Sequence, residues 1–194
     1  MHRQKSEWEN IYQNKSVPWD VGEPEPYLVK FIGKRNLKPC SAIDLGCGTG
    51  NEAIFLAKKG FKVTGVDISE LAIQEARKRA ENAAVKVDFI VSDIADLKIK
   101  NKFGFAFDRA CFHFIRPETR QKYIEFLKHS LVPGGFFLLI ISSDKETAKG
   151  PYQFTQKDIK SLFSKYFVIL SINLVTLKTH LANPRPYICV LKRR

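Results

Sequence analysis

Three glycines at alternate positions are the residues whose spacing most clearly points to chemistry. Gly46, Gly48 and Gly50 follow a short apolar run, and a helical pattern over Asn51–Lys59 begins directly after them. Glycine lets a backbone turn tightly and approach a ligand where a Cβ atom would collide. The first turn of a helix then presents free N–H groups to an anion. A second apolar run ends on Asp67, about 20 residues after the first glycine, where a carboxylate can accept hydrogen bonds from two ribose hydroxyls. The sequence therefore predicts a βαβ unit that binds a nucleoside-containing cofactor.

The spacing of these glycines separates two classes of cofactor. A dinucleotide fingerprint would have its third glycine at position 51, but Asn51 stands there and the third glycine is Gly50. Counted from Asp44, the pattern is Asp-x-Gly-x-Gly-x-Gly, which resembles motif I of the class I S-adenosylmethionine-dependent methyltransferases. The order of strands and helices along most of the chain is similar to that family too. The resemblance implies S-adenosyl-L-methionine as cofactor, S-adenosyl-L-homocysteine as product, and methyl transfer as the reaction.

The resemblance also assigns roles to residues at the ends of the first two strands. The glycine turn, with Cys47 inside it, would leave space for the methionine part of the cofactor. Asp44 could attract the cofactor's ammonium group, directly or through water, or could instead cap the glycine turn. Asp67 would bind the ribose hydroxyls and Ile68 could pack on the adenine. The alternative for Asp67 is an N-cap of the next helix, a position for which Ser69 competes.

The end of the third strand carries a further cofactor segment by the same resemblance. It comprises Ser92, Asp93 and Ile94. Asp93 would accept a hydrogen bond from the adenine amino group, and Ile94 would lie behind the ring. A solvent-exposed acid in a surface turn is the alternative for Asp93.

A closer resemblance appears in the N-terminal region. Trp8, Tyr12 and the segment Pro18–Pro26, which reads Pro-Trp-Asp-Val-Gly-Glu-Pro-Glu-Pro, look like the N-terminal lid of the thiopurine and thiol methyltransferase group. Tellurite, halide and small-heterocycle methyltransferases share related features. In that group the aromatic residue of the Trp-Asp pair covers the cofactor, which makes Trp19 the candidate here. An indole face stabilises a neighbouring sulfonium through the ring quadrupole. A core aromatic without this role is the alternative.

A second stretch of that resemblance follows the fourth apolar run. Phe107–His113 looks like the family's Asp-Arg-Gly/Ala segment at the mouth of the active site. Arg109 could meet an anionic acceptor such as a thiolate or an oxyanion, and is also a candidate contact of the cofactor. Asp108 could orient Arg109 or contact the amino end of the cofactor; a strand-end salt bridge is the alternative for both. His113 is a candidate general base, with a packing role as its alternative. These three are the candidate catalytic residues.

The elements that must position these residues alternate between strands and helices. Apolar runs at 42–45, 62–66, 86–91, 103–110 and 136–142 predict strands, and amphipathic stretches at 51–59, 70–82 and 118–129 predict the helices between them. Two more runs, 167–176 and 187–191, are joined by the short segment Lys178–Pro186 and should be antiparallel. We therefore predict one α/β domain over residues 1–194, which consists of a helical N-terminal lid (1–36) and a core (37–194). The core is a Rossmann-like three-layer sandwich whose mostly parallel seven-stranded sheet has one antiparallel strand near the C-terminus.

Composition narrows the class of partner. The net charge of +12 is carried by scattered lysines and arginines, which favours a solvated surface over a nucleic-acid site. The polar start and the short apolar runs predict neither a signal peptide nor a membrane span, and the cysteines show no metal-binding spacing. We expect a cytoplasmic monomer, with no metal, that methylates a small molecule (a thiol, a heterocycle or a chalcogen oxyanion) and acts in detoxification. The alternatives are an RNA or protein methyltransferase and a non-catalytic cofactor-binding domain.

Overall fold

The computed structural model describes residues 4–14, 17–146, 152–177 and 183–194. Its internal contacts divide the chain into two units, here called the N-terminal unit (Gln4–Ile94) and the C-terminal unit (Ala95–Arg194). The predicted connection Lys178–Pro186 lies partly outside the described residues.

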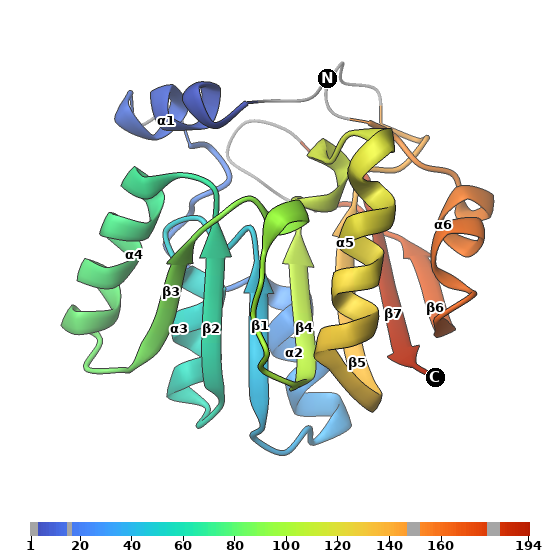
Figure 1. The fold of residues 1–194 in the computed structure, drawn as a ribbon, viewed down its shortest axis with the longest axis horizontal. Helices are drawn as coiled ribbons and strands as arrows, with labels where there is room; N and C mark the ends of the chain where they lie inside the picture. Colours follow the sequence, from blue (N-terminus) through green and yellow to red (C-terminus); the bar gives the residue numbers. More distant parts are fainter. Residues whose placement is uncertain (1–3, 15–16, 147–151, 178–182) are drawn as a thin grey trace. The chain divides into compact units, whose positions relative to one another are not determined.

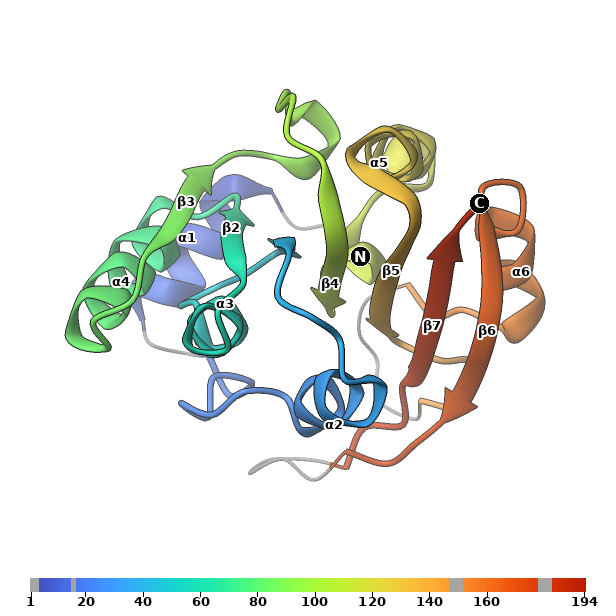
Figure 2. The same ribbon diagram turned by 90° about the horizontal axis from the view of Figure 1, so that it is seen from below.

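Parallel strands form the sheet of the N-terminal unit. They are β1 (Ser41–Leu45), β2 (Lys62–Asp67) and β3 (Val87–Val91), and β2 lies between the other two. The connecting helices are α3 (Asn51–Lys58) and α4 (Glu70–Asn82). Both pack on the same face of these strands, as Figure 2 shows, because each buries an apolar stripe. Since the strands are parallel, their carboxyl ends lie at one edge of the sheet.

Two helices precede β1. They are α1 (Lys5–Gln13) and α2 (Pro26–Arg35). Helix α1 lies beyond the carboxyl ends of β2 and β3, beside the start of α4 (Figure 1). Helix α2 begins with Pro26, whose fixed φ suits a first helical position, and the Glu25 side chain accepts a hydrogen bond from the Tyr27 N–H at 3.3 Å.

The C-terminal unit has the remaining four strands. They are β4 (Phe103–Arg109), β5 (Leu131–Ile141), β6 (Phe167–Leu174) and β7 (Tyr187–Arg193). Strand β4 pairs in parallel with β5, and β7 lies between β5 and β6, antiparallel to both. The predicted reversed strand is therefore confirmed as β7. Helices α5 (Pro117–Ser130) and α6 (Gln156–Phe163) contact β5 and β6 respectively.

Short helical turns complete the list of elements. The turn η1 (Ile94–Asp96) follows β3, and η2 (Phe112–Phe114) follows β4. The strand order is β3-β2-β1-β4-β5-β7-β6, so the predicted fold class, a Rossmann-like, mostly parallel seven-stranded sheet, is confirmed. None of the described helices combines the length and apolar character that crossing a membrane requires.

The structure departs from the sequence-based prediction in two places. Strand β5 begins at Leu131, ahead of the strand predicted at 136–142, and Pro133-Gly134-Gly135 is an irregularity within it, where the pairing with β4 shifts between Phe103 and Phe105. Gly134 has φ +78° there, so the chain bulges rather than reverses. Helix α6 was not predicted, because only Ile159 and Phe163 mark its buried side. Its N-terminal signal was readable: Thr155 and Asp158 form a capping box.

Candidate functional site

Side chains of neighbouring elements pack closely against the glycine turn at Gly48 and Gly50. Gly46, Gly48 and Gly50 have φ values of 72°, 51° and 86°, which side chains disfavour. A Cβ atom on Gly48 would lie 3.0 Å from the Tyr12 hydroxyl, and one on Gly50 would lie 3.1 Å from Ala76 Cβ. The turn is held to β2 because the N–H groups of Gly46 and Cys47 both donate to the Val66 carbonyl. The backbone of this turn is thus the surface that a ligand would meet.

Asp67 joins the glycine turn to the start of α4. It is 8% exposed; its Oδ2 accepts from the Gly48 N–H and its Oδ1 from the Ser69 N–H, both at 2.9 Å. Burial raises the pKa of Asp67, while these N–H groups favour the ionised form. Ser69 is the N-cap of α4, accepting from the Ala72 N–H. The alternative role of Asp67, an N-cap, is therefore filled by Ser69.

The other predicted cofactor residues of this unit lie at the same edge of the sheet. Asp44, 2% exposed, precedes the last residue of β1. Cys47 is buried within the glycine turn, and burial raises the pKa of its thiol well above the usual range, so the group is neutral. Ser92 follows β3: its N–H donates to the Asp67 carbonyl and its hydroxyl to the Asp93 carbonyl, both at 2.9 Å.

The apolar residues of this edge differ in burial. Ile68, directly after β2, is partly exposed, whereas Ile94, in η1, is 5% exposed. Ile68 therefore keeps apolar surface that a ring could cover.

Aromatic side chains of the lid lie close to this edge. Trp19 and Trp8 pack edge to face, with ring centroids 6.1 Å apart. Tyr12 is part of the predicted lid pattern but was not predicted as a site residue. Its hydroxyl is the group nearest to the position that a Cβ atom on Gly48 would occupy. Burial and the Asp67 carboxylate raise the pKa of Tyr12, so the hydroxyl stays protonated and can donate. The signal for Tyr12 was its spacing of four residues from Trp8 on one helix, which places both on the same face.

In the C-terminal unit, Asp108 holds the turn that follows β4. It is fully buried, and its carboxylate accepts from the N–H groups of Cys111 at 2.8 Å and Phe112 at 3.0 Å. The Tyr123 hydroxyl donates to it at 2.5 Å. Burial raises the pKa of Asp108 to about 7, against the effect of these donors. Asp108 is thus engaged in fixing the backbone that carries Arg109.

Arg109 is the last residue of β4 and is partly exposed. Ala110, its neighbour, has φ +68°, a left-handed conformation that costs an alanine about 1 kcal/mol. Its N–H donates to the Ile140 carbonyl at 3.0 Å. Backbone strain of this kind persists where surrounding contacts dictate it, and here it sets the direction in which the chain leaves β4.

His113 has a geometry unlike that of a general base. It is buried, and its Nδ1 accepts a hydrogen bond from the Ser142 N–H at 3.0 Å. A neutral imidazole that accepts at Nδ1 carries its proton on Nε2, so neither nitrogen has a free lone pair. Burial lowers the pKa of His113 to about 3. The predicted role of base does not fit this tautomer; the alternative, a packing histidine, does.

Comparison with known proteins identifies the family. The family model for thiopurine S-methyltransferase matches residues 3–183. The chain belongs to the thiopurine S-methyltransferase family. It is therefore an S-adenosylmethionine-dependent methyltransferase, and the family's acceptors are small molecules.

Individual relatives of this methyltransferase agree with that assignment. A 2-heptyl-1-hydroxyquinolin-4(1H)-one methyltransferase from Mycobacteroides abscessus is 27% identical over 161 residues, covering 80% of this chain and 70% of the relative. A probable thiol methyltransferase 2 from Arabidopsis thaliana is 28% identical over 157 residues, covering 77% and 70%.

Solved structures show the same fold. The 1,6-didemethyltoxoflavin-N1-methyltransferase from Burkholderia thailandensis, solved with bound 1,6-didemethyltoxoflavin and S-adenosylhomocysteine, has a TM-score of 0.82 at 20% identity. The match covers 97% of this chain and 86% of that one. A structure described as "Conversion of a Disulfide Bond into a Thioacetal Group during Echinomycin Biosynthesis" reaches a TM-score of 0.87 at 23% identity, covering 98% and 92%.

The described residues of the methyltransferase suit its cofactor. A turn of three glycines with positive φ, a buried carboxylate at the end of β2 and a partly exposed isoleucine beside it meet the needs of an amino-acid end, a ribose and an adenine respectively. The described part of the chain contains no group of three or more His, Cys, Asp or Glu side chains that could hold a metal ion.

Proposed function

We propose that this methyltransferase acts on a small acceptor that is already a nucleophile when it binds, above all a thiolate. The observation that carries the proposal lies at the end of β4 and in the turn that follows it. There Arg109 supplies a positive charge, while the Nδ1 lone pair of His113 is occupied by the Ser142 N–H and the Asp108 carboxylate by three donors. A segment that offers a cation and no available base suits an acceptor that needs no proton removed.

The cofactor would be held by the N-terminal unit. The glycine turn and Asp44 would take its amino-acid end, Asp67 its ribose, and Asp93 with Ile94 its adenine. S-adenosylmethionine supplies a methyl group on a positively charged sulfur, which a soft nucleophile displaces in line. The task of the protein is then to bind both partners in register and to exclude water.

Arg109 would attract the acceptor and orient it. A guanidinium binds a thiolate or an oxyanion by charge-assisted hydrogen bonds. The backbone that follows Arg109 is fixed by the left-handed φ of Ala110 and by the bonds of Asp108 to the following turn. The relatives named for thiol and hydroxyquinolone methylation support acceptors that are small and readily ionised.

The experiment is a panel of acceptors scored by release of S-adenosylhomocysteine. It includes thiols, phenols, ring nitrogens, chalcogen oxyanions and short RNAs, each assayed with wild type and with His113→Asn. The amide oxygen of asparagine can replace Nδ1 as the acceptor for the Ser142 N–H, whereas nothing replaces Nε2. We expect turnover of thiols that His113→Asn preserves within a few fold.

Two results would contradict the proposal. One is turnover confined to acceptors that stay protonated at the assay pH. The other is a loss of about 100-fold or more in His113→Asn, the size expected when a general base is removed, with the melting temperature of the variant unchanged.

A further inference from the structure

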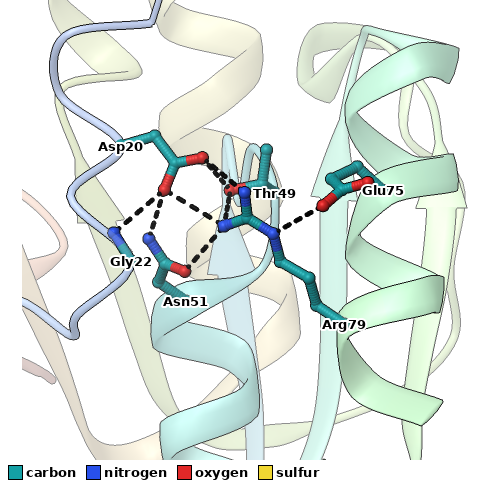
Figure 3. A network of polar contacts seen from close by, with 6 residues as sticks. All are labelled: Asp20, Gly22, Thr49, Asn51, Glu75 and Arg79. Carbon is teal, nitrogen blue, oxygen red and sulfur yellow. Dashed lines mark hydrogen bonds and ion pairs between the residues drawn. The ribbon is translucent and has the colours of Figure 1, made fainter. Parts of the chain in front are cut away.

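The lid residue Asp20 lies in a network of polar contacts within the N-terminal unit (Figure 3). Its Oδ2 accepts from the Thr49 hydroxyl and its Oδ1 from the Asn51 amide, both at 2.8 Å. The Arg79 guanidinium contacts both oxygens of the same carboxylate: Nη2 lies 3.0 Å from Oδ2, and Nη1 donates to Oδ1 at 3.1 Å. The Asp20 side chain is 7% exposed, so water competes poorly for these bonds.

Arg79 is itself held in place. Its Nε donates to Glu75 one helical turn earlier at 2.9 Å, and its Nη1 also reaches Thr49 at 3.0 Å and Asn51 at 3.1 Å. Burial opposes the charge of Asp20, but the hydrogen bonds from Arg79, Asn51 and Thr49 outweigh it and hold the pKa of Asp20 below its usual range. The network is therefore ionised and geometrically fixed, unlike a pair of solvated surface charges.

The position of the network relates it to the candidate cofactor site. Thr49 and Asn51 stand on either side of Gly50, the glycine that caps α3. Asp20 directly follows Trp19, the lid residue proposed to cover the cofactor. The bonds of Asp20 thus fasten the lid to the glycine turn itself.

A second anchor holds the lid from α1. The Glu9 carboxylate accepts from the Ser69 hydroxyl at 2.8 Å and from the Glu70 N–H at 2.7 Å, at the start of α4. Negative charge is favoured there because helix N–H groups point at it. Tyr12 and Trp19 lie between Glu9 and Asp20 in sequence. Glu9 is bonded to the start of α4, and Asp20 is bonded to Arg79 of α4 and to Thr49 and Asn51 at the start of α3.

We propose that Arg79 is a positioning residue of the methyltransferase: through Asp20 it fixes Trp19 and residues 17–25 of the lid at the glycine turn, and so sets the affinity for the cofactor. The proposal rests on the proposed function, since it places the cofactor at that turn. Because Glu9 anchors α1 separately, loss of Arg79 should release residues 17–25 while α1 stays in place.

The test compares Arg79→Met with wild type in three measurements. Calorimetry should show binding of S-adenosylhomocysteine weakened about tenfold, the size of one lost bidentate charge-assisted contact. The turnover number at saturating cofactor should change far less than KM for the cofactor. The Gly22 amide, which donates to Asp20 Oδ1 at 3.3 Å, should exchange its hydrogen faster, while amides of α1 should not.

Matched variants separate the proposal from a general loss of stability. Lys78→Met removes the same charge from the neighbouring, exposed position of α4 and should bind like wild type. Asp20→Asn keeps the shape of the side chain, so it tests the anchor even if Arg79→Met folds poorly. Its affinity for S-adenosylhomocysteine should match that of Arg79→Met, and the double variant should lose no more affinity than either single variant.

The outcomes distinguish the two proposals. If wild type bound S-adenosylhomocysteine and Arg79→Met bound it equally well, or if the two single losses simply added, the positioning role would be wrong and the proposed function would stand. If folded wild type bound no S-adenosylhomocysteine, the placement of the cofactor would be wrong, and the role of Arg79 would fail with it.

Discussion

Removing the Tyr123 hydroxyl is the sharpest test of how the segment after β4 is held. Tyr123 is fully buried, and its hydroxyl donates to the equally buried Asp108 carboxylate at 2.5 Å. A hydrogen bond to a charged group contributes about 2 kcal/mol, so Tyr123→Phe should lower the free energy of unfolding by about that amount. For a chain of this size, we expect the melting temperature to fall by about 4–8 °C.

The free energy of unfolding that Tyr123→Phe loses should depend on pH, and the titration of Asp108 decides in which direction. The unfolded carboxyl titrates near its ordinary pKa of about 3.9, whereas burial raises the folded pKa to about 7. Folding therefore takes up a proton between these values, and stability falls as pH rises through this window. The Tyr123 hydroxyl favours the ionised form, so its removal raises the folded pKa further. The difference between Tyr123→Phe and wild type should then grow above pH 7.

Urea unfolding at pH 6 and pH 8.5 measures this difference. Tyr187→Phe is the matched control, because it deletes the same atom from a bond of 2.9 Å to Asp144, whose side chain is 28% exposed. Tyr187→Phe should lose less free energy of unfolding than Tyr123→Phe, and its loss should not show a comparable dependence on pH. Equal losses in the two variants, or a Tyr123→Phe loss that is the same at both pH values, would refute the reasoning about Asp108.

Three further changes have defined outcomes. Ala110→Gly should raise the unfolding free energy by about 0.5 kcal/mol, because glycine accepts φ +68° without the cost that alanine bears; a lower melting temperature would count against strain there. Gly48→Ala should weaken S-adenosylhomocysteine binding more than tenfold by calorimetry, since its Cβ would lie 3.0 Å from the Tyr12 hydroxyl at φ +51°; Gly33→Ala, with open space around its Cβ, should bind normally. Arg109→Ala should lower turnover on the order of 100-fold with cofactor affinity nearly unchanged, and normal turnover would make Arg109 structural.

Local sequence signals predicted the strands and much of their pairing. The glycine turn, the strand ending at Asp67 and the Ser69 cap depend on residues close together in the chain, and each leaves a pattern that can be read directly. The antiparallel arrangement of the last strands followed from the shortness of the connection between them. Helix α6 shows the limit of periodicity: its buried side is marked by two residues, and its capping box was the better signal.

The tertiary contacts of the site could not be predicted in this way. Arg79 meets Asp20 across 59 positions of sequence, and His113 receives its hydrogen bond from a backbone N–H 29 positions away. Residue types do not reveal which backbone N–H donates to a side chain, so the hydrogen bond from Ser142 to His113 Nδ1 could not be predicted from the sequence. The contact between Asp108 and Tyr123 could not be predicted either, because it joins side chains 15 positions apart on different elements.

The pH dependence of kcat/KM with two small thiols of different acidity tests most directly whether the acceptor arrives as an anion. A thiolate acceptor at an enzyme without a general base predicts a rate that rises with pH and levels off at the pKa of each thiol, so that the two profiles are displaced by the difference between those values. Two profiles that instead share one inflection, set by a group of the protein, would contradict this account.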